Sequence, residues 1–144
     1  ADGGSLILGN GDGSVAMLDQ RTLRVTKSCQ LMGKVTSVSL STDGSVFFAG
    51  TDQGNSYRVP VSSLEPELRG TAHHSAVNSI VFPAGSSELF LTASFSDIRV
   101  WNAETRLELL RIQVPGLDCR ALTLSPDGRS IISGWDDGKI RAFY

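Results

Sequence analysis

The stretch "SIISGWDDGKIRAFY" (residues 130–144) reads as a strand, a tight turn and a second strand, and "LILGNGDGSVAMLD" (residues 6–19) repeats that pattern. In both copies, apolar residues flank a turn that is rich in Gly, Asp and Asn. Apolar runs separated by such turns are typical of antiparallel hairpins. The chain therefore begins and ends on versions of the same hairpin.

Two further copies lie between these and recur at a nearly constant period. A second series agrees with the first, because "LSTDG" and "LSPDG", which begin at Leu40 and Leu124, lie 84 residues apart. A period of about 40 to 45 residues with four short strands per unit is typical of β-propeller blades. The hairpins "LGNGDGSVAML", "AGTDQGNSYRV", "TASFSDIRVW" and "SGWDDGKIRAF" end at Leu18, Val59, Trp101 and Phe143, at spacings of 41, 42 and 42 residues.

The period predicts an all-β fold of four-stranded antiparallel blades, which we label a to d from the inside outward. The stretch "AETRLELLRI" would also suit a short amphipathic helix, but its place in the repeat favours an outer strand. The predicted units are residues 1–32 (a partial blade, strands b–d), 33–74, 75–116 and 117–144 (a partial blade, strands a–c).

Two whole blades and two partial ones do not close a propeller ring. We therefore expect the chain to be an internal segment of a longer protein. An open propeller exposes unpaired strand edges and apolar sheet faces. Self-association through those edges is the alternative expectation.

The amino-acid composition argues against nucleic acid and membranes as partners. The 13 basic and 15 acidic residues give a net charge of −2, which supplies no positive surface for nucleic acid or for an anionic membrane. The apolar runs are far shorter than the roughly 20 residues that span a bilayer. Cys29 and Cys119 lie 90 residues apart and resemble neither a disulfide framework nor a metal knuckle. We expect a reducing, cytoplasmic setting.

The motif "SPDGRSIISGWDDGKIRAF", the His before "AVNSIVF" and the Trp-Asn pair that ends the third hairpin resemble WD40 repeats along the whole chain. In that family, a His, an Asp, a Ser or Thr and a Trp share buried hydrogen bonds that fasten neighbouring strands. The third hairpin departs from the family spacing, because its turn is one residue shorter and its Asp lies only four residues before the Trp. The resemblance implies a structural network role for Asp12, His73, Asp97, Trp101 and Asp137.

Three patterns invite a catalytic or metal interpretation, and each has a simpler one. His73 and His74 could bind a metal, but no third His exists. Asp136 and Asp137 could act as acid and base, but paired Asp before Gly is ordinary turn chemistry. The glycines of residues 9–13 lack the Lys-Ser/Thr and the helix of a phosphate loop. We expect no enzyme activity, no cofactor and no metal.

Partner contacts are expected on the face of the propeller where the d–a and b–c loops open. Those loops carry large apolar residues beside charged ones, and aromatic residues and Met are enriched in interface cores. In the alternative interpretation, Phe95 and Trp135 pack back between blades. The candidates for partner contact are Met32, Lys34, His74, Phe95, Leu117, Asp118, Trp135 and Asp136.

Three stretches of the sequence resemble WD-repeat proteins of motile cilia. They are "IVFPAGSSELFLTASFSDIRVWN", "ELLRIQVPGLDC" and "SIISGWDDGKIRAF". The resemblance implies a non-catalytic scaffold inside the doublet microtubules of the axoneme, which binds tubulin and neighbouring luminal proteins and stabilises the wall. A generic WD40 adaptor, such as a substrate receptor of a ubiquitin ligase, would share every repeat feature. A propeller enzyme is disfavoured, because the inner strands supply mainly Ser and Thr between apolar residues.

Overall fold

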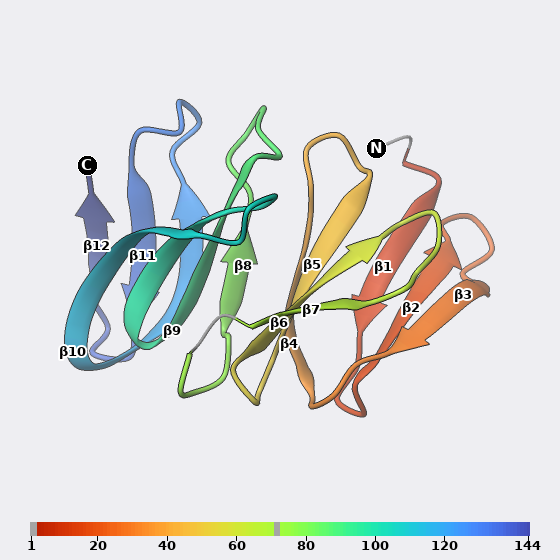
Figure 1. Cartoon of the computed structure of the whole chain (residues 1–144), viewed down its shortest axis with the longest axis horizontal. Coiled ribbons are helices and arrows are strands. Elements are labelled where there is room, and N and C mark those ends of the chain that lie inside the picture. The colour runs from red at the N-terminus through yellow and green to blue at the C-terminus, as the bar shows by residue number, and fades with distance from the viewer. Residues whose placement is uncertain (1–2, 71–72) are drawn as a thin grey trace.

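Strands and turns make up the whole of the computed structural model, which describes residues 3–70 and 73–144. Within those residues the chain forms twelve strands and no helix, and all paired strands run antiparallel. The sheets stand side by side (Figure 1). The predicted all-β antiparallel fold is confirmed, and "AETRLELLRI" contributes to a strand rather than to a helix.

The first two sheets are simple meanders in which each strand pairs with the next along the chain. Their b–c turns need glycine: Gly13 has φ +86°, and a Cβ there would lie 2.6 Å from the carbonyl oxygen of Leu31. The first sheet contains β1 (Ser5–Gly9), β2 (Ser14–Asp19) and β3 (Val25–Gln30), and the second contains β4 (Val35–Leu40), β5 (Val46–Thr51), β6 (Asn55–Pro60) and β7 (Glu67–Gly70).

The remaining strands form one continuous sheet with the order β12-β11-β10-β9-β8. Its strands are β8 (Ser79–Val81), β9 (Leu89–Asn102), β10 (Glu108–Leu124), β11 (Ile131–Trp135) and β12 (Ile140–Phe143). Two of these strands are longer than the others, and both change direction partway along.

The strand β9 folds back on itself. The amide of Ala103 donates to the carbonyl of Glu88 over 2.7 Å, although at about 3.3 Å per residue a straight strand would hold them some 50 Å apart. The reversal lies at Phe95 and Ser96, where Ser96 takes a φ of +67°. The two arms of β9 are therefore a hairpin with a very tight turn.

The strand β10 joins the two halves of this continuous sheet. Residues 108–113 pair with β9, residues 119–124 pair with β11, and the register shifts between Gln113 and Asp118. Gly116, with φ +77°, lies in that shift. We call β8, both arms of β9 and residues 108–113 the third sheet, and residues 117–124 with β11 and β12 the fourth sheet.

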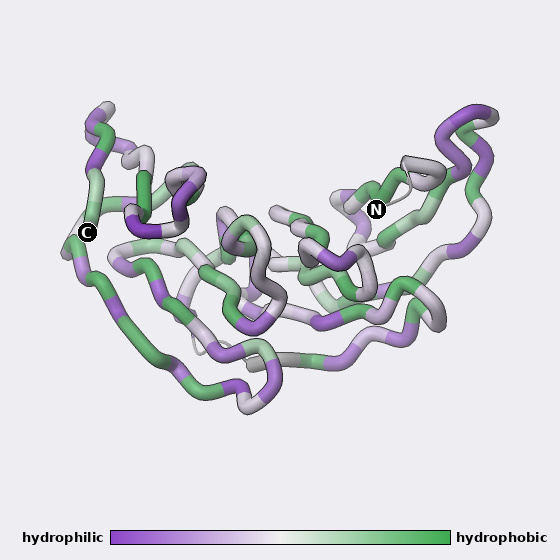
Figure 2. The backbone as a smooth tube through the Cα atoms, turned by 90° about the horizontal axis from the view of Figure 1, so that it is seen from above, coloured by the Kyte–Doolittle hydropathy of each residue, from purple (hydrophilic) through white to green (hydrophobic). Residues whose placement is uncertain are grey.

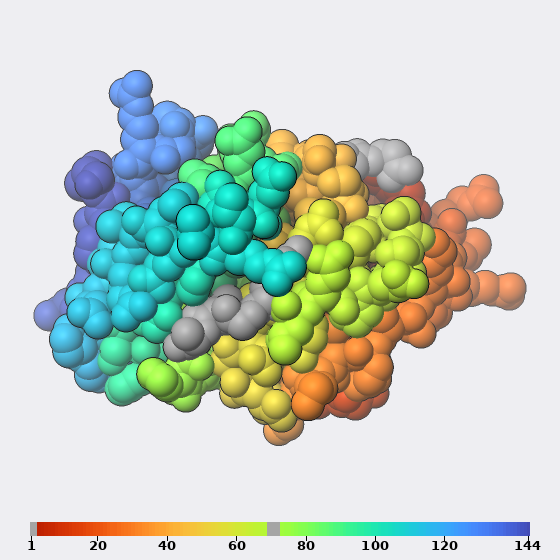
Figure 3. Space-filling model, viewed as in Figure 1, coloured from red at the N-terminus to blue at the C-terminus, as the bar shows by residue number. Residues whose placement is uncertain are grey.

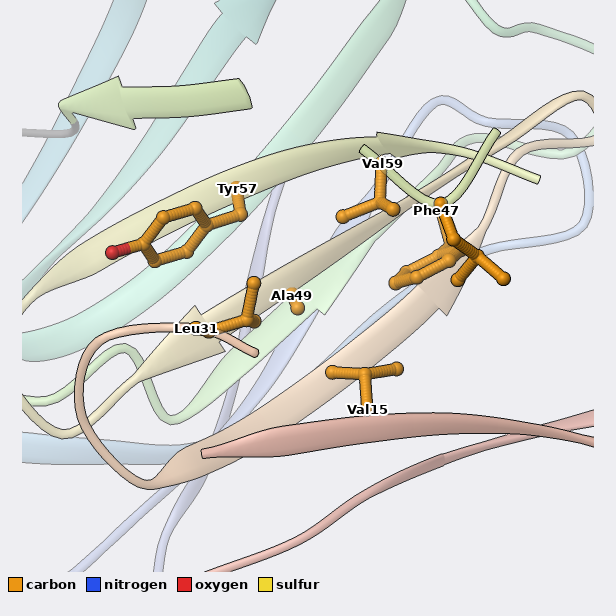
Figure 4. Close-up of a cluster of buried hydrophobic side chains, with 7 residues drawn as sticks. Val15, Leu31, Phe47, Ala49, Tyr57 and Val59 are labelled. Atoms are coloured by element: carbon orange, nitrogen blue, oxygen red, sulfur yellow. The ribbon is translucent and has the colours of Figure 1, made fainter. Parts of the chain in front are cut away.

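Apolar clusters fill the spaces between neighbouring sheets. The first cluster brings together Val15 of β2 with Phe47 and Val59 of the second sheet, and their side chains point toward one another (Figure 4). Phe48, the next residue of β5, faces the second cluster with Trp101 instead. Successive side chains of a strand point to opposite faces, so β5 is buried on both sides, and its unbroken apolar run "VFFAG" follows from that position.

Neighbouring sheets converge at their first strands. β4 contacts β8, and β8 contacts β10. The hydroxyl of Thr36 donates to the carbonyl of Val77 over 2.6 Å, and the side-chain amide of Asn78 donates through Nδ2 to the carbonyl of Cys119 over 2.9 Å. The sheets then diverge toward their outer strands, which gives the backbone the arc seen from above in Figure 2.

Close approach between sheets depends on a glycine in the second strand. A Cβ at Gly50 would lie 2.8 Å from Cβ of Val77, two residues before the first strand of the next sheet. A Cβ at Gly9 would likewise lie 2.9 Å from Cβ of Val35, in the first strand of the second sheet. At Gly134 the nearest atom to such a Cβ is in its own sheet, at Ala121, 3.7 Å away. The fourth sheet is therefore open at the position where the first two sheets are closed.

Candidate functional site

A buried hydrogen-bonded chain crosses the third sheet. The indole N–H of Trp101 donates to Oγ1 of Thr92 over 2.8 Å, and Nε2 of His73 lies 2.7 Å from the same oxygen. All three residues are buried. Because the hydroxyl accepts from the indole, its own proton can go to Nε2 of His73, which leaves the ring proton on Nδ1.

The other ring nitrogen faces a carboxylate. Nδ1 of His73 lies 2.9 Å from Oδ1 of Asp97, and Arg99 holds Oδ2 through Nη2 at 2.7 Å and Nε at 2.8 Å. Burial raises the pKa of Asp97, but the hydrogen bonds from His73 and Arg99 outweigh it, and the pKa lies below its ordinary value. Asp97 is therefore a buried anion with a cation on one side.

The charges continue outward along the sheet. Nη1 of Arg99 lies 3.3 Å from Glu108, whose carboxylate also accepts two hydrogen bonds from Arg111, each 2.9 Å long. The hydrogen bonds from Arg111 lower the pKa of Glu108. This alternation of charge connects the buried Asp97 with the solvent-exposed edge of β10.

The shorter turn of the third hairpin still brings Asp97 to His73. The two-residue reversal at Phe95 and Ser96 places Asp97 as the first residue of the returning arm. From there its carboxylate meets His73, and Arg99, two residues on along the same face, fixes its orientation. Among the expected network residues, the structure thus joins His73, Asp97 and Trp101.

The other two expected network residues lie in separate turns. Asp12 accepts from the amide and the hydroxyl of Ser14, at 2.9 and 2.7 Å. Asp137 pairs with Arg141 at 3.1 and 2.7 Å, and these hydrogen bonds lower the pKa of Asp137 to about 2. Neither carboxylate meets a histidine in the described residues.

Two central residues of the network are missing from the sequence-based set. The hydroxyl of Thr92 accepts from the indole of Trp101 and contacts the imidazole of His73. Arg99 donates to the carboxylate of Asp97. The sequence carries a signal for Thr92, because it stands nine residues before Trp101, as Ser133 stands ten before Phe143. Arg99 has an analogue as well, since Arg141 holds Asp137 in the fourth sheet.

The candidate contact residues of the loops differ in exposure. Met32 is 69% exposed and Phe95 is 49% exposed, so both offer apolar surface. Trp135 is 4% exposed, and its indole N–H donates to Oγ of Ser133 over 2.8 Å. Trp135 therefore departs from the expected contact role. It packs instead in a third apolar cluster, with Ala93, Ile98 and Cys119, as in the alternative interpretation.

The polar candidates of the same loops mostly hold the loops together. The amide of Asp118 donates to Oδ1 of Asp136 over 3.1 Å, and the amide of Asp136 donates to the carbonyl of Asp118 over 3.0 Å. The amide of Lys34 donates to Asp52 over 2.8 Å. Leu117 is partly buried against the third cluster, and His74 is exposed.

The cysteines and the acidic groups offer little for chemistry. Burial raises the pKa of Cys119 to about 11, so its thiol stays protonated at neutral pH. No group of three His, Cys, Asp or Glu side chains with metal-binding geometry occurs in residues 3–70 and 73–144. Within those same parts of the chain, no helix is long and apolar enough to span a membrane.

The sequence is similar to known proteins of more than one kind. The chain is 44% identical over 140 residues to cilia- and flagella-associated protein 52 of Bos taurus, which covers 97% of this chain and 22% of that protein. It is 41% identical over 143 residues to the protein of the same name from Chlamydomonas reinhardtii, with 97% and 23% covered. The small ribosomal subunit protein RACK1 of Schizosaccharomyces pombe is 29% identical over 120 residues, with 77% and 38% covered.

No family model matches the chain. The chain spans less than a quarter of the length of its ciliary relatives. The matched region nevertheless covers 97% of this chain. The repeat, the sheets and these similarities together show that the chain is a WD-repeat segment whose sequence is similar to part of cilia- and flagella-associated protein 52.

Proposed function

We propose that the chain is part of a non-catalytic scaffold of the ciliary axoneme, which binds tubulin and neighbouring proteins inside doublet microtubules and stabilises the wall. The observation that carries this proposal is the identity of 41 to 44% to cilia- and flagella-associated protein 52 along 97% of the chain. The names of these relatives associate them with cilia and flagella, and the proposal extends that association to this chain.

The geometry supports a scaffold because the polar groups at the candidate site bind one another. His73, Asp97 and Trp101 are buried and contact one another or Thr92 and Arg99 within the third sheet, so they stabilise the fold rather than face a substrate. A rigid set of sheets with exposed apolar loop residues, such as Met32 and Phe95, is suited to presenting surface.

A general adaptor in another intracellular complex is the second candidate. The similarity to RACK1, which covers 77% of the chain, favours it, because that protein is not named for cilia. The two functions differ in the partner and not in the mechanism. Both require the loop face to be accessible and the buried network to be intact.

Microtubule binding by the protein at its full natural length tests the proposal. Co-sedimentation with microtubules assembled from purified tubulin is the measurement. We expect binding, and we expect Phe95→Ser to weaken it by about tenfold, as for an interface anchor. Leu23→Ser is the matched control, because Leu23 is 62% exposed in a c–d loop at the opposite end of its sheet.

Thermal unfolding of both variants shows whether the fold is intact. Loss of co-sedimentation in Phe95→Ser with an unchanged midpoint, and normal binding in Leu23→Ser, would support the proposal. Absence of the wild-type protein from the microtubule pellet would contradict it and favour the adaptor. Equal binding by both variants would remove Phe95 from the contact surface.

A further inference from the structure

The outer strand of the third sheet exposes an unusual amount of apolar surface. Leu107 is 63% exposed, Leu109 is 55% exposed and Leu110 is 50% exposed, all within or next to the start of β10. In Figure 3 the segment that contains them, coloured teal to light blue, lies on the near surface of the molecule. Consecutive leucines at the surface are characteristic of sites where another chain binds.

The backbone of this strand has a free side. Residues 108–113 pair with β9, and β11 pairs with β10 only from Cys119 onward. No strand of the described residues therefore lies along the other edge of residues 108–113. An edge of this kind presents unpaired N–H and C=O groups, which are complementary to an extended peptide backbone.

The outer strands of the first two sheets are protected in ways that this one is not. β3 carries Lys27 at its centre, whose Nζ donates to the carbonyl of Ser62 over 2.6 Å. β7 is only four residues long. A central Lys and a short length both discourage strand addition. In the third sheet the charged residues Glu108 and Arg111 bind each other and leave the leucines uncovered.

An apolar groove lies next to this edge, between the third and fourth sheets. Its volume is about 430 Å³, and its walls include Leu110 and Ile112 from β10 and Ile131 and Phe143 from the fourth sheet. Arg129 is the one charged residue of the lining, and its guanidinium has no partner in the described part of the chain. The groove therefore suits an apolar side chain with a carboxylate nearby.

We propose that residues 108–113 of β10 bind an extended, acidic segment of a protein partner by strand addition. The backbone of the segment pairs with the free edge, one apolar side chain enters the groove beside Leu110, and a carboxylate meets Arg129. This inference rests on the proposed scaffold function, for which it names a contact surface and the chemistry of the partner segment.

Peptide binding to the full-length protein tests the inference, with fluorescence anisotropy as the measurement. The probe is a fluorescein-labelled hexapeptide of alternating valine and glutamate, and the comparison peptide has lysine in place of glutamate. We expect the acidic peptide to bind at least about tenfold more tightly than the basic one. N-methylation of alternate peptide amides should abolish binding, because it removes the donors of the strand pairing.

Variants locate the site. Leu110→Ser should weaken binding of the acidic peptide by about tenfold, and Arg129→Gln should remove most of the preference for the acidic peptide over the basic one. Leu68→Ser is the matched control, because Leu68 is 54% exposed on the outer strand β7 and should leave binding unchanged. Hydrogen exchange should slow at residues 108–113 when the acidic peptide is bound.

Three results of the peptide experiments would overturn the inference. They are failure of the acidic peptide to bind at millimolar concentration, equal loss of binding in Leu110→Ser and Leu68→Ser, and exchange protection confined to another strand. Dimerisation that Leu110→Ser abolishes, without any peptide binding, would assign the edge to a second copy and also overturn it. Microtubule co-sedimentation reports on the scaffold function separately, so the two proposals can fail independently.

Discussion

At the scale of single residues, one hydroxyl organises the buried network. Oγ1 of Thr92 meets Nε2 of His73 at 2.7 Å and the indole N–H of Trp101 at 2.8 Å. Two rings from different segments of the chain thus share one small side chain in the interior. A buried donor that loses its partner costs about 1 to 3 kcal/mol.

Replacement of Thr92 by Val keeps the shape of the side chain and removes the oxygen. We expect the free energy of unfolding to fall by about 2 to 4 kcal/mol, because two buried ring nitrogens lose their partner. Urea denaturation measures the change. Thr123→Val on the exposed side of β10 is the control and should alter stability by less than about 0.5 kcal/mol. Equal effects of the two substitutions would show that the oxygen of Thr92 is not special.

The carboxylate of Asp97 makes the stability of the fold depend on pH. Its pKa in the folded chain lies below the ordinary value of 3.8. Its contribution is therefore complete above the unfolded pKa and disappears as the pH falls through the folded pKa. We expect Asp97→Asn to be less stable than the wild type at neutral pH, by a difference that is constant down to about pH 5 and shrinks below that.

Denaturation of both proteins at a series of pH values measures that difference. Glu104→Gln serves as the control, because Glu104 is exposed and makes no ion pair in the described residues. A difference between wild type and Asp97→Asn that stays constant into the acid range would contradict the assignment of a buried anion.

At the scale of strands, the sequence predicts the hairpins well because turn residues and apolar runs are local signals. The stretch "AETRLELLRI" shows where a local signal is ambiguous and the repeat resolves it. The folding of β9 onto itself and the continuity of β10 into the fourth sheet are not visible locally. They depend on pairing between strands, which the local sequence of each strand does not encode.

The site is less predictable than the strands for the same reason. A network role for His73, Asp97 and Trp101 is implied by the resemblance to WD40 repeats and not by the local sequence of any one strand. Thr92 takes its role from a contact across the hairpin, to Trp101, and Arg99 takes its role from a contact along one arm, to Asp97. The surroundings of Trp135 have a similar origin, since the guanidinium of Arg141 lies over its ring only once β11 and β12 pair.

The second-strand glycines give a matched pair of substitutions. A Cβ at Gly50 would lie 2.6 Å from Oγ of Ser37 and 2.8 Å from Cβ of Val77, whereas one at Gly134 would meet nothing closer than 3.7 Å. We expect Gly50→Ala to destabilise the chain by about 1 to 3 kcal/mol through overpacking, and Gly134→Ala to be neutral or stabilising. Thermal unfolding measures both. Equal midpoints would show that the sheets can separate without cost.

At the scale of the whole molecule, the two ends of the arc differ from its middle. The face of the fourth sheet around Gly134 is open, and Ile140 of β12 is 79% exposed. We expect the mass of the 144-residue chain in solution to rise with concentration over the micromolar range, because unpaired edges associate. Light scattering measures the mass. Ile140→Lys should reduce the association, and a monomer at every concentration would contradict the prediction.

The convergence of the sheets at their first strands also has a mechanical meaning. The bonds from Thr36 to Val77 and from Asn78 to Cys119 lie along a hinge line, and each four-stranded sheet is a lever of about 14 Å, three strand spacings long. A force on the outer strands acts on those bonds with that leverage. The arc is therefore most easily bent by loads at its rim, and a brace attached to the outer strands resists bending with the least force.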